Sequence, residues 1–169
     1  NSILGWLPGG LGMAAILTCM FFAAISGSGP ATVAAIGGIM IPEMEKAGYD
    51  KAFAAALMAV SGAIGVIIPP SIPMVNFGVV GSVSIATLFA AGFGPGILVG
   101  LALMIVTFIT AKKNGYGLAV KQKFSIVNVG KEFIKAFWAL LMPVIILGGI
   151  YGGIFTPTEA AAVAVIYGS

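Results

Sequence analysis

Long apolar stretches, separated by short polar or proline-containing segments, dominate the hydrophobicity pattern of this chain. The apolar stretches at 9–41, 51–80, 95–111 and 136–153 are each long enough to enter deeply or cross the roughly 30 Å hydrocarbon core of a bilayer. The chain is 60% hydrophobic and 8% charged, which is more apolar than a soluble domain requires. The pattern therefore predicts an all-α polytopic membrane protein.

The first apolar stretch, Gly9–Ile41, is interrupted only by the polar segment SGSGP at 26–30. As one straight helix it would be about 50 Å long, which is far more than the membrane core needs. As two helices, its second arm, Ala31–Ile41, is too short to cross. We therefore expect residues 9–42 to form a re-entrant helical hairpin with its tip at membrane depth. One full span followed by a short interfacial helix is the alternative.

The tip of this predicted hairpin is rich in residues that offer oxygen atoms or unusual backbone conformations. Glycine tolerates dihedral angles that other residues avoid, and serine and threonine add hydroxyl groups. An irregular polar segment at membrane depth must be buried in protein or line a cavity. We therefore predict an ion-binding tip formed by Ser26, Gly27, Ser28, Gly29 and Thr32.

The second apolar stretch, 51–80, contains the segment PPSIP at 69–73. Proline removes a backbone donor and clashes with the preceding turn, so the segment predicts a broken helix rather than a continuous one. Transporters use such breaks to bind ions and substrates through freed carbonyl groups. A proline kink without function is the alternative. The candidate ion- or substrate-binding residues at the break are Ser61, Gly65, Pro69, Pro70 and Ser71.

The connections between the apolar stretches contain further helix signals. We expect Asp50 to cap the helix that begins at Lys51, and 85–91 to be a short interfacial helix before the span 95–111. Residues 157–169 begin another helix, opened by the capping box Thr156-Pro157-Thr158-Glu159. Glu159 is the only acid expected near the membrane, and its capping role explains it without a functional one.

Six lysines lie in the connection 112–135, which the positive-inside rule assigns to the cytoplasm. Counting crossings back from there through 95–111 and 51–80 puts the 43–51 connection on the same side, in agreement with Lys46 and Lys51. The hairpin then enters from the cytoplasmic side, and 136–153 crosses outward.

Several classes of chemistry are disfavoured by what the chain lacks. It has no histidine and a single cysteine, Cys19, so neither an intrachain disulfide nor a Cys/His metal cluster is possible. No phosphate-binding G-x-x-x-x-G-K-[ST] motif occurs, and no nucleophile–base pair is available. We expect no enzyme activity, no cofactor and no nucleic-acid partner. Because the chain starts without Met and ends inside an apolar helix, we expect 1–169 to be a fragment of one transmembrane transport domain.

Two long segments, SGSGPATVAAIGGIMIPEMEKAGYDKAFAAALMAVSGAIGVIIPPSIPM and GGIFTPTEAAAVAVIYG, resemble the large permease (DctM-like) subunit of tripartite ATP-independent periplasmic (TRAP) transporters. The similarity covers nearly the whole chain. It implies an ion-transporter-like fold of two inverted repeats, each with a hairpin and a broken helix. This chain would hold the hairpin and broken helix of the first repeat.

The resemblance also implies a function. It implies a secondary active transporter subunit in the plasma (inner) membrane of a bacterium or archaeon, with Na+-coupled uptake of organic acids of the C4-dicarboxylate or sialic-acid type. The expected partners are a small membrane subunit, a periplasmic solute-binding protein that delivers the substrate, and the lipid bilayer. Na+ would bind through the tip and break residues, since a hard cation suits carbonyl and hydroxyl oxygens. A re-entrant-loop channel, or an ion or anion transporter without a binding protein, is the alternative.

The predicted topology can be tested by labelling. Single cysteines at Lys46 and Lys121, in a background without Cys19, should resist a membrane-impermeant thiol reagent applied to intact cells, because the lysine distribution puts both connections in the cytoplasm. Both should react once the membrane is permeabilised. Labelling of either position from the periplasmic side would contradict the topology.

Overall fold

The computed structural model describes residues 7–117 and 141–168, and every regular element in these residues is a helix. The expectation of an all-α protein is therefore confirmed for the described part. In chain order the elements are α1 (Gly10–Ser26), α2 (Gly29–Thr32), a π-helical turn (Val33–Gly37), α3 (Gly38–Lys46), α4 (Lys51–Ala63), a 3-10 turn (Ile64–Val66), α5 (Ile72–Val80), α6 (Ile85–Asn114), a helix at Leu141–Tyr151 and α8 (Pro157–Gly168).

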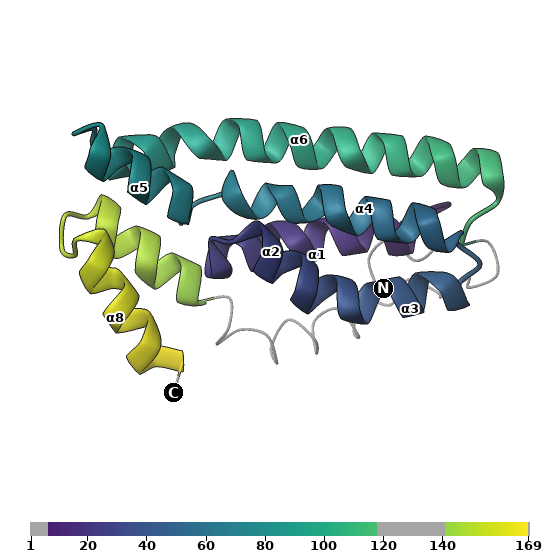
Figure 1. The fold of residues 1–169 in the computed structure, drawn as a ribbon, viewed down its shortest axis with the longest axis horizontal. Coiled ribbons are helices and arrows are strands. Elements are labelled where there is room, and N and C mark those ends of the chain that lie inside the picture. The colour runs from purple at the N-terminus through teal and green to yellow at the C-terminus, as the bar shows by residue number, and fades with distance from the viewer. Residues whose placement is uncertain (1–6, 118–140, 169) are drawn as a thin grey trace.

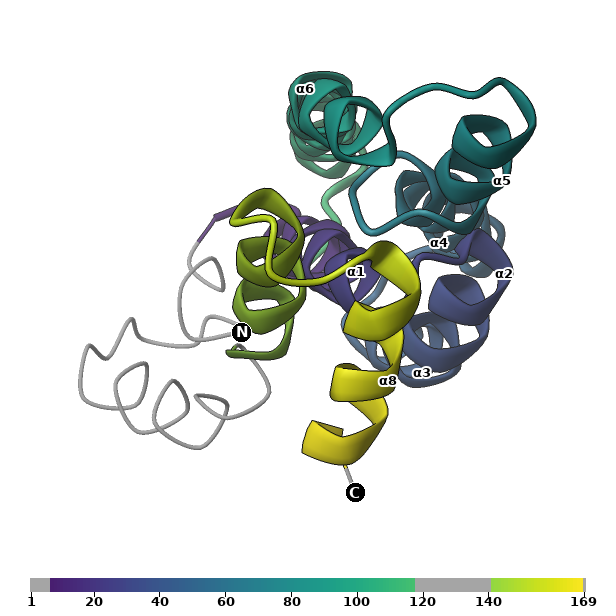
Figure 2. The ribbon, with the colours of Figure 1, turned by 90° about the vertical axis from the view of Figure 1, so that its left-hand side faces the viewer.

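Three long helices run side by side along the molecule. Figure 1 shows α6, α4 and α1 lying lengthwise, and α1 contacts both of the others. The second arm, α2 to α3, packs against α4. The helix at 141–151 and α8 gather at the end where α1 finishes and α5 begins (Figures 1 and 2). The hairpin tip, the break and the C-terminal helices therefore meet at one end of the molecule.

Residues 10–46 form a helical hairpin whose two arms run in opposite directions (Figure 1). The second arm is longer than the sequence suggests, because α3 continues through Pro42 to Lys46. Met44, beyond this proline, is fully buried, so packing of the arm offsets the hydrogen bond that Pro42 cannot make. The entry of both arms from one side of a membrane stays a prediction.

Helix α6 differs from the sequence-based expectation of a short helix at 85–91 followed by a span at 95–111. It is continuous over Ile85–Asn114, with Pro95 in its interior, and Ser84 caps it by accepting a hydrogen bond from Thr87 N at 3.3 Å. Proline is tolerated inside apolar helices when the freed backbone groups find other partners or the helix adjusts locally. Among the described residues, α6 is the one helix long and apolar enough to cross a membrane; Gly10–Ser26, Lys51–Val66 and Leu141–Tyr151 are shorter apolar helices.

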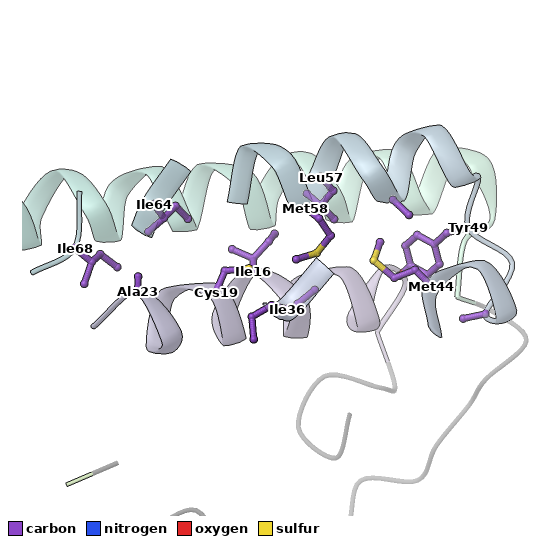
Figure 3. Close-up of a cluster of buried hydrophobic side chains, with 13 residues drawn as sticks. Ile16, Cys19, Ala23, Ile36, Met44, Tyr49, Leu57, Met58, Ile64 and Ile68 are labelled. Carbon is purple, nitrogen blue, oxygen red and sulfur yellow. The ribbon is translucent and has the colours of Figure 1, made fainter. Parts of the chain in front are cut away.

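The main core lies between the hairpin and the broken helix. Figure 3 shows side chains from α1 meeting those of α4 and of the segment that follows it. Ile16, Cys19, Met58 and Ile64 are fully buried there. A smaller cluster of buried residues joins α6 to the C-terminal helices and comprises Phe89, Ile146, Ile150 and Ala160. Apolar packing thus fixes how the hairpin and the break face each other.

The predicted caps are confirmed in atomic detail. Asp50 Oδ1 accepts a hydrogen bond from Phe53 N at 2.9 Å and so opens α4. At α8, Thr156 N donates to Glu159 Oε2 at 2.8 Å, and Glu159 N donates to Thr156 Oγ1 at 3.3 Å. The hydrogen bonds that the carboxylate accepts from the Thr156 amide and hydroxyl lower the pKa of Glu159. Its carboxylate is therefore engaged at the helix start.

The lysine-rich connection 112–135 and the span 136–153 are described only in part. Residues 118–140 lie outside the described residues, so most of the predicted cytoplasmic connection and the start of the span do too. Within the remainder, Leu141–Tyr151 is helical and Gly153 has a φ of 68° in the turn that leads to α8.

Close packing of α4 against the second hairpin arm can be tested at Gly62. A Cβ built there would overlap Val33 Cγ2 and would lie 3.2 Å from Gly29 O, whereas a Cβ at Gly38 meets nothing within 4 Å. We expect Gly62→Ala to destabilise the protein by about 1–3 kcal/mol, the usual range for overpacking. Gly38→Ala, with the same gain in helix propensity, should be neutral or stabilising by roughly 0.5–1 kcal/mol.

The measurement is the unfolding midpoint of the purified full-length protein in detergent. Equal midpoints for the two variants would show that the hairpin arm does not pack on α4 in this way.

Candidate functional site

The hairpin tip is a compact turn between α1 and α2. Gly27 ends α1 with a φ of 61°, a left-handed conformation that suits glycine, and its N–H bonds back to Ala23 O at 3.0 Å. Ser28 is extended and caps α2 by accepting from Ala31 N at 3.5 Å. Pro30 fits the first turn of α2, where no backbone donor is needed.

Three oxygen atoms converge inside this tip. The Thr32 hydroxyl donates to Ser28 O at 2.8 Å and lies 3.1 Å from the Ser26 hydroxyl. Ser26 Oγ in turn lies 3.4 Å from Ser28 O. Thr32 is fully buried. The tip therefore presents a cluster of neutral oxygens with unused lone pairs, which are the ligands that a hard monovalent cation prefers.

The break between α4 and α5 is a short non-helical passage at 67–71. Ile67 N and Ile68 N both donate to Ile64 O at 2.9 Å, which ends the 3-10 turn. Ser71 then closes the passage: its hydroxyl donates to Val66 O at 2.7 Å and accepts from Met74 N at 3.4 Å. Ser71 is 1% exposed. One serine thus satisfies a carbonyl on one side of the break and an amide on the other.

The tip and the break lie against each other. Ile72 N donates to Gly27 O at 3.2 Å, and a Cβ at Gly27 would lie 2.6 Å from Pro70 O. A Cβ at Gly65 would lie 2.7 Å from Thr32 Oγ1 and 3.0 Å from Ser28 O. Glycine at 27 and 65 lets the two irregular backbones approach to a distance that a side chain would prevent.

These contacts show which predicted site residues the fold brings together. The tip residues meet the break at Gly65, Pro70 and the amide of Ile72. Gly29 of the tip also lies close to α4, because a Cβ at Gly29 would be 3.1 Å from Gly62 O. Ser26, Gly27, Pro70 and Ser71 also line one cavity. Pro69 is buried in the passage itself. The Ser61 hydroxyl is fully buried and lacks a hydrogen-bond partner among the described residues, the tip included.

A cavity of about 440 Å³ opens beside the tip and the break. Besides the predicted residues, it is lined by parts of α5, α6, the helix at 141–151 and α8, which sequence reasoning did not assign to a site. These residues include Asn76, Phe89, Ile146, Ile150, Thr158 and Ala161. Asn76 could have been identified from the sequence as a candidate, because it is the only amide side chain within α5. The others come from segments distant in sequence and gave no such indication.

The electrostatics of this region come from neutral dipoles. None of the described residues that line the cavity is charged, and the described part of the chain contains no group of three or more His, Cys, Asp or Glu that could hold a metal ion. Glu159 does not line the cavity, although Pro157 and Thr158 of the same helix turn do. Hydroxyls, carbonyls and helix ends are therefore the groups available for a polar ligand at this site.

Comparison with known proteins gives a consistent result. Residues 1–168 match the family model described as "Tripartite ATP-independent periplasmic transporter, DctM component". The chain is 55% identical over 99% of its length to the isethionate TRAP transporter permease protein DctMQ of Oleidesulfovibrio alaskensis, of which it covers 26%. It is 52% identical over 98% of its length to the C4-dicarboxylate TRAP transporter large permease protein DctM of Vibrio cholerae, of which it covers 36%.

A third relative is named for a different solute. The sialic acid TRAP transporter permease protein SiaT of Haemophilus influenzae is 42% identical over 99% of this chain, which covers 27% of its length. The chain thus spans between 26% and 36% of these three relatives. With a family match over almost every residue and identities of this size, the chain belongs to the DctM family, the DctM component of tripartite ATP-independent periplasmic transporters.

Proposed function

We propose that this chain carries the cation-binding half-site of a Na+-coupled permease that moves small organic acids across the inner membrane of a bacterium. The observation that carries the proposal is the meeting of the hairpin tip with the helix break. There, Ser28 O and Thr32 Oγ1 face Gly65, and Ser26 Oγ lies 3.1 Å from Thr32 Oγ1. Family membership supports transport of a solute; the coupling ion, the substrate and the partners are proposals.

Na+ is the proposed coupling ion because the donors at this site are uncharged oxygens. Carbonyl and hydroxyl oxygens suit hard cations, while transition metals favour imidazole or thiolate ligands. Freed carbonyls next to a helix break are also the groups that transporters use to hold coupling ions. Ser61, one helical turn before Gly65, has a buried hydroxyl without a hydrogen-bond partner among the described residues, and we include it as a candidate further donor.

The cavity beside the tip is the proposed place of the solute. It adjoins Ser26 and Gly27 on one side and Ser71 and Asn76 on another, so a bound solute would contact the same segments as the cation. The first turns of α5 and α8 supply dipoles that favour an anionic group. Relatives are named for isethionate, C4-dicarboxylate and sialic acid, all of them organic acids.

The proposed partners follow from the type of transporter. We propose that a small membrane subunit assembles with the permease and that a periplasmic solute-binding protein delivers the substrate. The relatives are named as permease proteins, which accords with a role in transport rather than catalysis. Choice among solutes would then depend on the delivery protein and on the cavity together.

The cation proposal can be tested at Thr32 with a matched control on α1. Thr32 and Thr18 both donate their hydroxyl to the carbonyl four residues earlier, each at 2.8 Å, but Thr32 is buried at the tip and Thr18 is exposed. Thr32→Val should weaken Na+ binding by about 1–3 kcal/mol, the cost of one unmade buried polar contact. The Na+ concentration for half-maximal uptake should therefore rise in Thr32→Val and stay unchanged in Thr18→Val.

The assay is uptake of radiolabelled C4-dicarboxylate, isethionate or sialic acid into proteoliposomes with the complete transporter and its binding protein. The same Na+ dependence in both variants would exclude the Thr32 hydroxyl from the site.

A second test separates a functional break from a simple kink. Alanine is the better helix former by about 3 kcal/mol per residue, so Pro69→Ala combined with Pro70→Ala should extend the helix and keep the protein inserted. A continuous helix would withdraw the carbonyls that now face Gly27 and the Ser71 hydroxyl. We expect the doubly substituted transporter to co-purify with its small subunit but to lose Na+-driven uptake.

The measurement is uptake in the same proteoliposomes after co-purification has been verified. Near-normal Na+-dependent uptake by this variant would show that the prolines only bend the helix.

A further inference from the structure

The helix break has a second face, opposite the hairpin tip, which lies against α6. At this face a Cβ built at Gly92 would lie 2.6 Å from the carbonyl oxygen of Ile67 and 2.7 Å from Met74 Cε. Gly92 is buried within a regular part of α6. The backbone of the break therefore rests directly on the backbone of α6 at this residue.

Space, rather than conformation, explains glycine at this position. Gly92 has ordinary helical dihedrals, which any residue could adopt, so no left-handed turn requires it. Gly94, two residues later on the same helix, has nothing within 4 Å of a built Cβ. Two glycines in one turn of α6 thus differ in what they face, and Gly94 also precedes Pro95.

We propose that Gly92 is a positioning residue for the cation site. By allowing α6 to approach the break closely, it fixes the position of the break residues that form the site. This inference rests on the proposed function, because the site that it adjusts is the one between tip and break. Gly92 is not among the residues that line the cavity, and the atoms nearest to a Cβ there belong to Ile67 and Met74, so it would act through Ile67.

The transmission is short and runs along the chain. Ile67 follows Val66, whose carbonyl accepts the Ser71 hydroxyl at 2.7 Å, and Gly65, whose surface meets Thr32 Oγ1. A methyl group at residue 92 could displace Met74 Cε, because that atom ends a flexible side chain. It could not compress a backbone carbonyl, so Ile67 would have to move toward the tip.

Three alanine substitutions on α6 form a graded series. Gly92→Ala meets a backbone oxygen. Gly96→Ala meets Ile68 Cγ1 at 2.5 Å, a side-chain atom that can adjust in part. Gly94→Ala meets nothing outside its chain neighbours and serves as the control on the same helix. Because Gly94 precedes Pro95, this substitution gains less helix propensity than Gly92→Ala, so the variants are compared by their half-saturating NaCl concentration and not by their stability.

The experiment uses the full-length transporter purified with its membrane partner. The unfolding midpoint is measured as NaCl replaces KCl at constant ionic strength, and the half-saturating NaCl concentration is taken from its rise. We expect about a fivefold or larger increase for Gly92→Ala, a smaller increase for Gly96→Ala and none for Gly94→Ala. A purely structural role would lower the midpoint in KCl without moving the half-saturating NaCl concentration.

The outcomes separate this inference from the proposal on which it rests. Equal half-saturating NaCl for folded Gly92→Ala and Gly94→Ala overturns the inference alone. Absence of any NaCl-specific rise in the unmodified transporter overturns the cation site and the inference with it. If Gly92→Ala does not yield folded protein, Gly96→Ala decides: a half-saturating NaCl concentration above that of Gly94→Ala supports the positioning role, and an equal one overturns it.

Discussion

Backbone groups released by a broken helix need partners in apolar surroundings, and this need shapes the whole structure. The break at 67–71 frees carbonyls that no helix can pair. The Ser71 hydroxyl pairs Val66 O, and the amide of Ile72 pairs Gly27 O of the hairpin tip. The break thus pairs one of its freed carbonyls internally, and its following amide pairs a carbonyl of the hairpin tip.

This pairing requires the backbones to come very close. Glycine stands at each point of approach: Gly27 against Pro70 O, Gly65 against Thr32 Oγ1, and Gly92 against Ile67 O on the far side. Around these points, Asp50 caps α4, and side chains of α1 and α4 form an apolar core. Ordinary packing thus positions an unusual backbone arrangement.

The oxygen cluster at the tip is our proposed cation site because it consists of uncharged carbonyl and hydroxyl oxygens. The adjoining cavity is different, with a mostly apolar lining and a few hydroxyl and amide groups. Relatives named for isethionate, C4-dicarboxylate and sialic acid are 42% to 55% identical to this chain. We expect residues shared over such different solutes to serve the common steps of transport rather than the choice of solute.

The sequence by itself determined the features that depend on neighbouring residues. PPSIP predicts a break because adjacent prolines remove donors and clash with the preceding turn, and Asp50 and Glu159 predict caps through bonds three residues away. Single prolines, Pro42 and Pro95, in contrast lie inside continuous helices, and the short helix expected at 85–91 is the first part of α6. One proline removes a single backbone hydrogen bond, whereas PPSIP places three prolines within five residues.

Only the tertiary structure decided which distant residues meet. The approach of Gly65 to Thr32, the cavity that joins Asn76 to Thr158, and the support of Ile67 by Gly92 each connect segments from different helices. Local propensity contains no information on these pairs, because their distances depend on how α1, α4 and α6 pack through their apolar faces. The residue types of the site could thus be named from the sequence, whereas its geometry arises from packing.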